Sequence, residues 1–370
     1  MRNFNSKNNQ IVMIENLKKI HSELGGLSSP VIHIAGSKGK GTTAFLLAKI
    51  LEMSGRKVGM FSSPAIFRIE EMIQVNGIHI SEEKLKEYMT RVPALREGLS
   101  EFESITLAGL AYFEDEGCDF VILECGWGGA KDATNAVERK ALTILTHIEL
   151  EHTDVLGQTI PEIAAEKIGI CRQDVPLLTV ASQVPEVFDE IEEAGFSTTI
   201  VPSRDLGYHH PESVGLAVAA AEQLGITIND EILSALERLQ IPGRFEITEW
   251  GMHTLVLDGA HTFNSIRYVR ERVLEYAQNK GLADPLWGIH FLSDKQKDLW
   301  KLFPVQRTIW AEIDHPRAGD TPGALPSATV TEIFEQLKAE QTPKLLVFVG
   351  SFRLVAAVKE ELLKNPSRLG

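Results

Sequence analysis

The chain has 370 residues, more than a single ordinary hydrophobic core requires, and this length fits two domains. Its 51 acidic residues outnumber its 37 lysines and arginines, and the net charge of −14 argues against nucleic acid or an anionic membrane as the main partner. The three cysteines, Cys118, Cys125 and Cys171, are odd in number and lack metal-ligand spacing, which is typical of a reducing compartment.

The sequence also carries no sign of a membrane segment. No apolar run approaches the length of a bilayer span. Residues 1–10 are polar and lack the apolar region of a signal peptide. We therefore expect a cytoplasmic monomer that works without nucleic acid or a membrane.

Apolar runs alternate with helix-period segments through the first part of the chain. The predicted strands are 31–35, 58–62, 120–124, 142–147 and 177–181. The predicted helices are 44–53, 104–116, 160–170, 212–224 and 230–239. Continuous apolar strands separated by helices indicate an α/β domain with a parallel sheet covered on both faces.

A Pro-Gly pair at residues 242–243 interrupts this pattern and predicts a domain boundary, with domains at 1–243 and 244–370. Strands are expected at 255–257, 287–291, 308–313 and 345–349, and helices at 266–279 and 328–339. The second domain is therefore expected to be a smaller, Rossmann-like α/β domain. Its polar segment 314–322 is expected to be a surface loop.

The stretch 31–43, VIHIAGSKGKGTT, joins a buried strand to a helix through a glycine-rich loop. Backbone N–H groups of such a loop can surround an anion, the helix N-terminus favours negative charge, and a lysine can reach the outer phosphates. Lys40 is the candidate lysine, and Thr42 or Thr43 can offer a hydroxyl to Mg²⁺. The loop reads G-x-x-G-K-G-T and differs from the common P-loop spacing, because Ile34 occupies the position of the first glycine. The alternative is a plain connecting turn.

Other polar residues follow the predicted strands of the first domain. Glu124 ends an apolar strand and is placed like the acid that holds magnesium in P-loop enzymes. The alternative for Glu124 is a carboxylate that faces solvent. His152 follows the next strand, and Lys167 lies in the helix beyond it. Taken alone, these two residues are an ordinary structural histidine and a solvated lysine.

The second domain repeats this arrangement. The segment 257–261, LDGAH, places Asp258 and His261 after a strand, where they can contact a ribose, a phosphate or an amino acid. The alternative for Asp258 is an Asx-type turn that caps the next helix. Arg244 at the domain junction could reach a phosphate. Ser351 precedes a helix whose N-terminus could bind a carboxylate.

Taken together, these motifs resemble the Mur ligase superfamily, and most closely its folylpolyglutamate synthase/dihydrofolate synthase branch. The loop 36–42 is similar to the family's G-T-N-G-K-G-S, and 62–64 to its T-S-P. Residues 124–129 and 132–135 match E-x-G-x-G-G and D-A-T-N, and 151–170 match D-H-x-x-x-L-G-x-T with E/H-K-A-G-I. The motifs P-G-R, D-G-A-H, D-K and G-S follow at Arg244, His261, Lys295 and Ser351.

The resemblance implies an ATP-dependent amide ligase that uses ATP and Mg²⁺. A small-molecule carboxylate acceptor would attack the γ-phosphate to form an acyl phosphate. The amine of an amino acid, L-glutamate by this resemblance, would then displace phosphate. Positioning and charge stabilisation would drive both steps.

The same resemblance implies a role for each matched residue. The implied catalytic residues are Lys40, His152 and Lys167, of which Lys167 would be carbamylated. The implied metal ligands are Thr42, Ser63, Glu124 and His152. The implied nucleotide site comprises Gly36, Ser37, Lys38, Gly39, Lys40, Gly41, Thr42, Thr43, Arg244, Asp258 and His261. The incoming amino acid would contact His261 and Ser351.

The chain departs from the family pattern at positions that shape the substrate side. Lys38 stands where the family has Asn, Ala65 follows the 62–64 motif, and Ala130 with Lys131 replaces Arg-Leu. The acceptor is therefore left open, as a folate or another carboxylate. Two other functions remain open at this stage: a P-loop ATPase or kinase, and a nucleotide-binding module without ligase activity.

Overall fold

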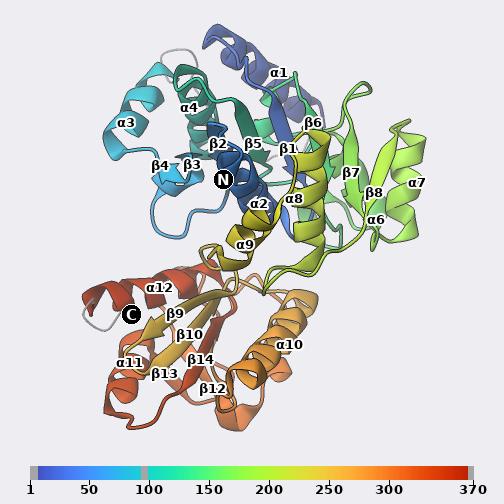
Figure 1. Ribbon diagram of the computed structural model, residues 1–370. Helices are drawn as coiled ribbons and strands as arrows, with labels where there is room; N and C mark the ends of the chain where they lie inside the picture. The colour runs from blue at the N-terminus through green and yellow to red at the C-terminus, as the bar shows by residue number, and fades with distance from the viewer. Residues whose placement is uncertain (1–6, 93–98, 366–370) are drawn as a thin grey trace. The chain divides into compact units, whose positions relative to one another are not determined.

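The computed structural model describes residues 7–92 and 99–365, and the chain divides into two compact units, Met1–Leu239 and Gln240–Gly370 (Figure 1). Residues 1–6 of the polar N-terminal segment lie outside the described part of the chain. The predicted domain boundary lies between residues 243 and 244, and the functions assigned to the two domains stay predictions.

The first unit is built on one mixed sheet with the strand order β4-β3-β2-β5-β1-β6-β7-β8. The strands are β1 Val31–Ala35, β2 Val58–Phe61, β3 Ile73–Val75, β4 Ile78–His79, β5 Phe120–Glu124, β6 Leu142–Leu145, β7 Leu177–Val180 and β8 Thr198–Val201. The six strands from β2 to β8 in this order are parallel, and β3 and β4 add an antiparallel hairpin at one edge. The predicted α/β class with a parallel sheet is confirmed.

Helices cover both faces of this sheet. They are α1 Lys7–Glu23, α2 Lys40–Met53, α3 Glu82–Arg91, α4 Glu101–Asp115, α5 Thr153–Leu156, α6 Ile160–Ile168, α7 Pro185–Glu193, α8 Pro211–Gln223 and α9 Asp230–Arg238, with short 3₁₀ turns at Ile69–Met72 and Ala133–Ala136. Helices α2 and α8 pack together over the middle strands (Figure 1). Helices α1 and α4 pack together, as do α6 and α7. This layering buries the apolar strands on both sides.

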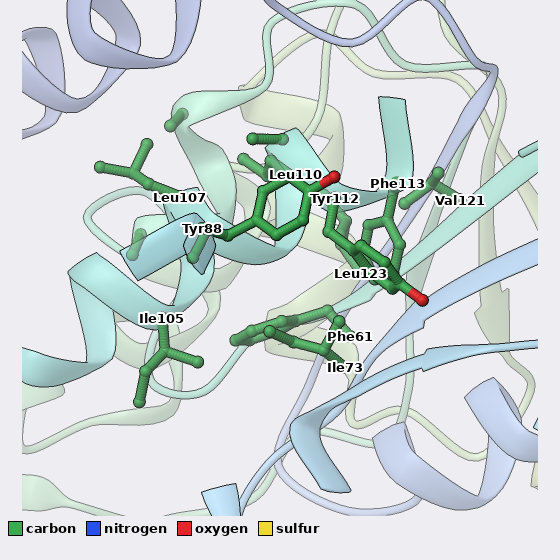
Figure 2. Close-up of a cluster of buried hydrophobic side chains, with 14 of the residues drawn as sticks. Phe61, Ile73, Tyr88, Ile105, Leu107, Leu110, Tyr112, Phe113, Val121 and Leu123 are labelled. Carbon is green, nitrogen blue, oxygen red and sulfur yellow. The ribbon is translucent and has the colours of Figure 1, made fainter. Parts of the chain in front are cut away.

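An aromatic cluster anchors one side of the sheet. Figure 2 shows Phe61, Tyr88, Tyr112, Phe113 and their aliphatic neighbours from α3, α4 and the adjoining strands. The rings of Tyr88 and Tyr112 meet edge to face, with centroids 5.4 Å apart. Such packing is rigid, because a well-filled interior transmits strain instead of yielding. The cluster therefore fixes the ends of β2 and β5, from which two candidate site residues extend.

The second unit is a smaller α/β unit, as predicted. Its sheet has the order β13-β12-β11-β14-β10-β9, and only β9 is antiparallel to its neighbour. The strands are β9 Glu246–Trp250, β10 His253–Asp258, β11 Leu286–Ile289, β12 Thr308–Glu312, β13 Ser327–Thr329 and β14 Leu345–Val349. The helices are α10 Phe263–Lys280, α11 Val330–Ala339 and α12 Phe352–Lys364, with 3₁₀ turns at Leu299–Leu302 and Val305–Arg307. Helices α11 and α12 pack together (Figure 1).

Two predicted ends differ from the observed ones for local reasons. Helix α2 begins at Lys40 rather than residue 44, because Gly39 adopts a left-handed conformation at its N-cap. Strand β6 ends at Leu145 rather than residue 147, and the carbonyl of His147 instead accepts hydrogen bonds from the N–H groups of Ser37 and Lys38. Both differences arise at the glycine-rich loop, because Gly39 belongs to the loop and His147 is hydrogen-bonded to it. None of the helices in the described ranges is long and apolar enough to span a bilayer.

Candidate functional site

The glycine-rich loop follows β1 at the carboxyl edge of the first sheet, between neighbours β5 and β6. Gly36 and Gly39 have φ values of 141° and 88°, which side-chain-bearing residues rarely adopt. A Cβ atom on Gly36 would lie 2.0 Å from Thr146 Oγ1, and one on Gly39 would lie 2.9 Å from Ser213 Oγ. The loop is therefore pressed against its surroundings, and glycine is required at both positions.

The loop leads directly into the N-terminus of α2. Thr43 N donates to Gly39 O at 2.8 Å, so the N–H groups of Lys40, Gly41 and Thr42 precede the first helical hydrogen bond. Thr42 is buried, and the fully buried Thr43 Oγ1 has no hydrogen-bond partner in the described structure. N–H groups at the start of a helix and the positive end of its dipole both favour an anion.

Two lysine side chains converge on the loop. Lys40 Nζ donates to Gly36 O at 2.8 Å, and Lys167 Nζ donates to the same oxygen at 2.9 Å. Lys167 is 1% exposed and also pairs with Glu151 Oε1 at 2.8 Å. Burial lowers the pKa of Lys167, the charge of Lys40 lowers it further, and Glu151 partly opposes both. An anion at this point would relieve the repulsion between the two ammonium groups.

Glu124 and Ser63 meet beside the loop. Glu124 ends β5, is 3% exposed, and its Oε2 accepts a hydrogen bond from Ser63 N at 3.1 Å. In the strand register, Glu124 pairs with Ile34 of β1. Ile34 is the penultimate residue of that strand. This answers the question left open by the sequence: the Glu124 carboxylate is buried at the strand end and does not face solvent.

The chemistry of these residues fits a hard divalent cation. Hydroxyl and carboxylate oxygens, as at Thr42, Ser63 and Glu124, are the ligands that Mg²⁺ prefers, together with phosphate oxygens. His152 lies at the N-cap of the four-residue α5, with φ of 46°, and its side chain is exposed. In residues 7–92 and 99–365, no group of three or more His, Cys, Asp and Glu side chains is arranged to hold a metal. A metal ion at this site would therefore depend on the hydroxyl groups of Thr42 and Ser63 and on phosphate oxygens of a bound substrate.

A buried polar network lies beneath this edge and was missed by the sequence analysis. His33, in the middle of β1, is fully buried and lies 2.8 Å from Thr134 Oγ1 and 3.1 Å from Cys125 Sγ. Asp132 accepts hydrogen bonds from Thr134 and, at 2.7 Å, from Trp127 N. The network fixes the loop that follows Glu124. The signal available in the sequence was a histidine inside an otherwise apolar strand.

The helix that carries Lys167 is held at its C-terminal end. Lys140 Nζ donates to Asn135 Oδ1 and Ile170 O, both at 2.6 Å, and Arg172 donates to the carbonyls of residues 169–171. These donors satisfy carbonyl groups of the turn that follows α6, which ends at Ile168. A Cβ atom on Gly129 would lie 2.7 Å from Glu166 O, so the backbone after β5 packs directly on α6.

The candidate residues of the second unit follow β10 and β14. Asp258 accepts hydrogen bonds from Phe245 N and Ala260 N, both at 2.7 Å. Burial raises the pKa of Asp258, and the positive charge of Arg244 opposes that rise. The bond to Ala260 N is the Asx-type turn considered above, but Thr262 caps α10 and Asp258 does not.

The other three residues are also held locally. His261 Nδ1 lies 2.8 Å from Gly259 O, and Ser351 Oγ accepts from Leu354 N at 3.1 Å as the N-cap of α12. The guanidinium of Arg244 lies over the ring of Phe352, 4.7 Å from its centroid. The structure thus brings together the loop, Lys40 and Lys167 in the first unit. In the second unit, it places Arg244, Asp258, His261 and Ser351 at one edge of the sheet.

A parallel sheet whose central strand enters a glycine-rich loop and a helix defines a P-loop nucleotide-binding protein. Comparison with known proteins narrows this class. Residues 34–194 match the model of the Mur ligase middle domain. The chain is 30% identical to the dihydrofolate synthase/folylpolyglutamate synthase of Bacillus subtilis over 82% of this chain and 81% of the relative. The corresponding protein of Buchnera aphidicola is 29% identical over 92% of this chain and 90% of the relative.

Solved structures agree with these relatives. The bifunctional folylpolyglutamate synthase/dihydrofolate synthase of Yersinia pestis, complexed with AMPPNP and a Mn ion, superimposes with a TM-score of 0.84 at 26% identity, covering 95% of this chain and 93% of that one. The E. coli FolC structure with ADP gives 0.84 at 26% identity, covering 96% and 94%. The chain belongs to the folylpolyglutamate synthase/dihydrofolate synthase family of the Mur ligases, a family of ATP-dependent acid–amino-acid ligases.

Proposed function

We propose that this protein joins L-glutamate to a small carboxylate acceptor and consumes ATP in doing so, with an acyl phosphate as the intermediate. The observation that carries the proposal is the glycine cradle at the start of α2, with Lys40 Nζ held 2.8 Å from Gly36 O. Such a cradle favours the binding of a polyphosphate. The family membership supplies the reaction class.

In this proposal the loop residues 36–43 bind the phosphates of ATP, and Lys40 neutralises charge on the γ-phosphoryl group as it is transferred. The acceptor carboxylate attacks the γ-phosphorus, the bond between the β-phosphate oxygen and the γ-phosphorus breaks, and ADP leaves as the acyl phosphate forms. The glutamate amine then attacks the acyl carbon, loses a proton and expels phosphate. No covalent bond to the protein is needed, so the protein acts by positioning and by charge stabilisation.

Thr42, Ser63, Glu124 and His152 would hold the divalent cation in this proposal, and the cation would polarise the phosphoryl oxygens. Lys167 is proposed to carry a carbamate. Its support is the burial that lowers the pKa of Lys167, because only the neutral amine can combine with carbon dioxide.

We assign ATP binding to residues 1–243 and amino-acid binding to residues 244–370. In the second segment, Arg244, Asp258 and His261 would complete the nucleotide site, and His261 with Ser351 would receive glutamate. The acceptor is a folate, as in the names of the relatives, or another carboxylate.

We also propose a cytoplasmic monomer that needs neither nucleic acid nor a membrane. The buried, free thiols of Cys118, Cys125 and Cys171 support a reducing compartment.

The test is ADP release by the full chain in the presence of candidate acceptors, with and without L-glutamate. We expect release that requires both acceptor and glutamate, and a product heavier by one glutamyl residue in mass spectrometry. Release that never depends on an amine would contradict the ligase and favour the ATPase or kinase alternative. A metabolite extract, supplied with several amino acids, would identify the acceptor in the same format.

A further inference from the structure

The phosphate-binding loop carries a second ion pair that the proposed reaction does not use. Lys38 Nζ lies 3.3 Å from Glu149 Oε1, and both side chains are half-buried. Glu149 belongs to the segment that follows β6. This segment is tied to the loop by its backbone as well, because Ser37 Oγ donates to Glu149 O and accepts from Glu149 N, both at 3.1 Å.

Other hydrogen bonds also attach the loop to this segment. Besides the two bonds of Ser37 Oγ, the N–H groups of Ser37 and Lys38 donate to His147 O at 2.9 and 3.1 Å. The ion pair adds little to this attachment, because desolvation offsets much of the attraction between two half-buried charges. Burial indeed lowers the pKa of Lys38, against the opposing charges of Glu149 and Glu151.

Two lysine–glutamate ion pairs lie around the loop. Glu149 faces Lys38, and Glu151, two residues later, faces Lys167. Lys40, two residues after Lys38, is near enough to both Lys38 and Lys167 to lower the pKa of each. Three cations and two carboxylates therefore share one small region at the start of α2. A polyphosphate entering the cradle would bring the anionic charge that the two glutamates now provide.

We propose that Glu149 is an internal counterion for Lys38 which the phosphates of the nucleotide displace, so that the Lys38–Glu149 pair sets the affinity of the loop for nucleotides. The inference rests on the proposed function, because it requires a nucleotide at this loop. Lys38 would contact phosphate in the bound state, and Glu149 would compete with phosphate for the same ammonium group.

The consequence is a defined pattern of affinities. Glu149→Gln removes the competitor and should tighten the binding of ADP about fivefold at low salt, the range expected for one partly screened ion pair. Lys38→Met removes the cation and should weaken binding about fivefold to tenfold. In the presence of Lys38→Met, the added Glu149→Gln change should alter affinity less than about twofold, because Glu149 acts through Lys38.

The experiment is isothermal titration calorimetry of the full chain with Mg²⁺ and either ADP or a non-hydrolysable ATP analogue, for the wild type, both single variants and the double variant. Glu116→Gln is the matched control. It breaks a comparable pair, Lys84 to Glu116 at 2.7 Å, next to Lys57 at the opposite edge of the sheet. The Glu116→Gln control should leave nucleotide affinity unchanged. Higher salt should reduce the increase in nucleotide affinity caused by Glu149→Gln.

The outcomes distinguish a failure of the Glu149 counterion from a failure of nucleotide binding at the loop. Tighter binding by Glu149→Gln that disappears in the double variant supports the counterion. Unchanged or weaker binding by Glu149→Gln, or an equal gain with and without Lys38, overturns it while leaving the nucleotide site intact. Absence of ADP binding in every variant, including the wild type, contradicts the proposed function and the counterion with it.

Discussion

The carboxyl edges of the two sheets carry similar motifs but satisfy their polar groups in different ways. At the first edge, charged side chains face one another around a glycine loop: Lys40 and Lys167 share Gly36 O, and Lys167 also pairs with Glu151. At the second edge, Asp258, His261 and Ser351 are each hydrogen-bonded to backbone groups. Ser351 caps α12, for example, and Asp258 accepts two backbone N–H groups.

This difference predicts different consequences for substitutions at the two edges. Like charges held close together cost free energy, and an incoming anion relieves that cost, so the first edge should control turnover. Groups that are already hydrogen-bonded to the backbone are fixed in orientation before a ligand arrives, so the second edge should control affinity for the amino acid. Substitutions at each edge test this division.

Lys40→Ala should lower the rate of ADP release by about a thousandfold, which is typical of losing one group that stabilises transition-state charge in a closed site. Binding of ADP should weaken much less. The measurement is steady-state ADP release combined with calorimetry of ADP. A large loss of ADP affinity with an unchanged rate at saturation would place Lys40 in binding alone.

Lys167→Ala should lower turnover by about a hundredfold, and short carboxylic acids such as acetate should restore part of the activity, because they can replace a carbamate in the space that the lysine vacates. Lys84→Ala, which removes a half-exposed lysine of α3, is the matched control and should show neither effect. Full activity of Lys167→Ala without any added acid would count against the carbamate.

Ser351→Ala should raise the KM for glutamate about tenfold and leave kcat nearly unchanged. It also removes the N-cap of α12, with a loss of about 1 kcal/mol in the free energy of unfolding. Thr329→Ala is the control, since it removes the corresponding cap of α11. It should show a similar loss of stability and no change in KM. Equal KM changes in both variants would mean that Ser351 acts only through helix stability.

Another effect concerns the support beneath the first edge. Burial lowers the pKa of Lys140 to about 7, from an ordinary value of 10.5. Between these values the unfolded chain binds more protons than the folded chain, so the unfolding free energy should rise with pH in this window. Below pH 7 the lysine is charged in both states, and its contribution should be constant.

Comparison of the wild type with Lys140→Met isolates this contribution, because other titrating groups cancel in the difference. The wild type should gain about 2 kcal/mol over the variant between pH 7 and 9. The measurement is urea denaturation at a series of pH values. A difference that stays constant, or falls with pH, would contradict a buried, neutralised Lys140.

Much of this fold could be read from the sequence because the central strands are continuously apolar. The predicted strands at 31–35 and 120–124 coincide with β1 and β5, since strands buried on both faces leave little doubt about their extent. Edge elements were missed, such as β8, where Thr199 and Ile200 are exposed. Helix α1 was also missed, although Ile14, Leu17 and Ile20 recur at helical spacing and are buried.

The candidate site was predictable where residues share a motif. The loop 36–43 and Lys40 could be recognised from local order alone. The contact of Lys167 with Gly36 could not, because the two residues are 131 positions apart and only the sheet order brings them together. The same holds for Lys38 with Glu149, and for the buried pair of His33 and Thr134.

The most direct test of the central claim is the transfer of oxygen from acceptor to phosphate. The acceptor carboxylate is labelled with ¹⁸O, the full chain is supplied with ATP, Mg²⁺ and L-glutamate, and the released phosphate is analysed by mass spectrometry. An acyl phosphate formed at the first edge predicts one ¹⁸O atom in each phosphate released. Phosphate that carries no label, released together with ADP, would show that water attacks ATP and would contradict carboxylate activation.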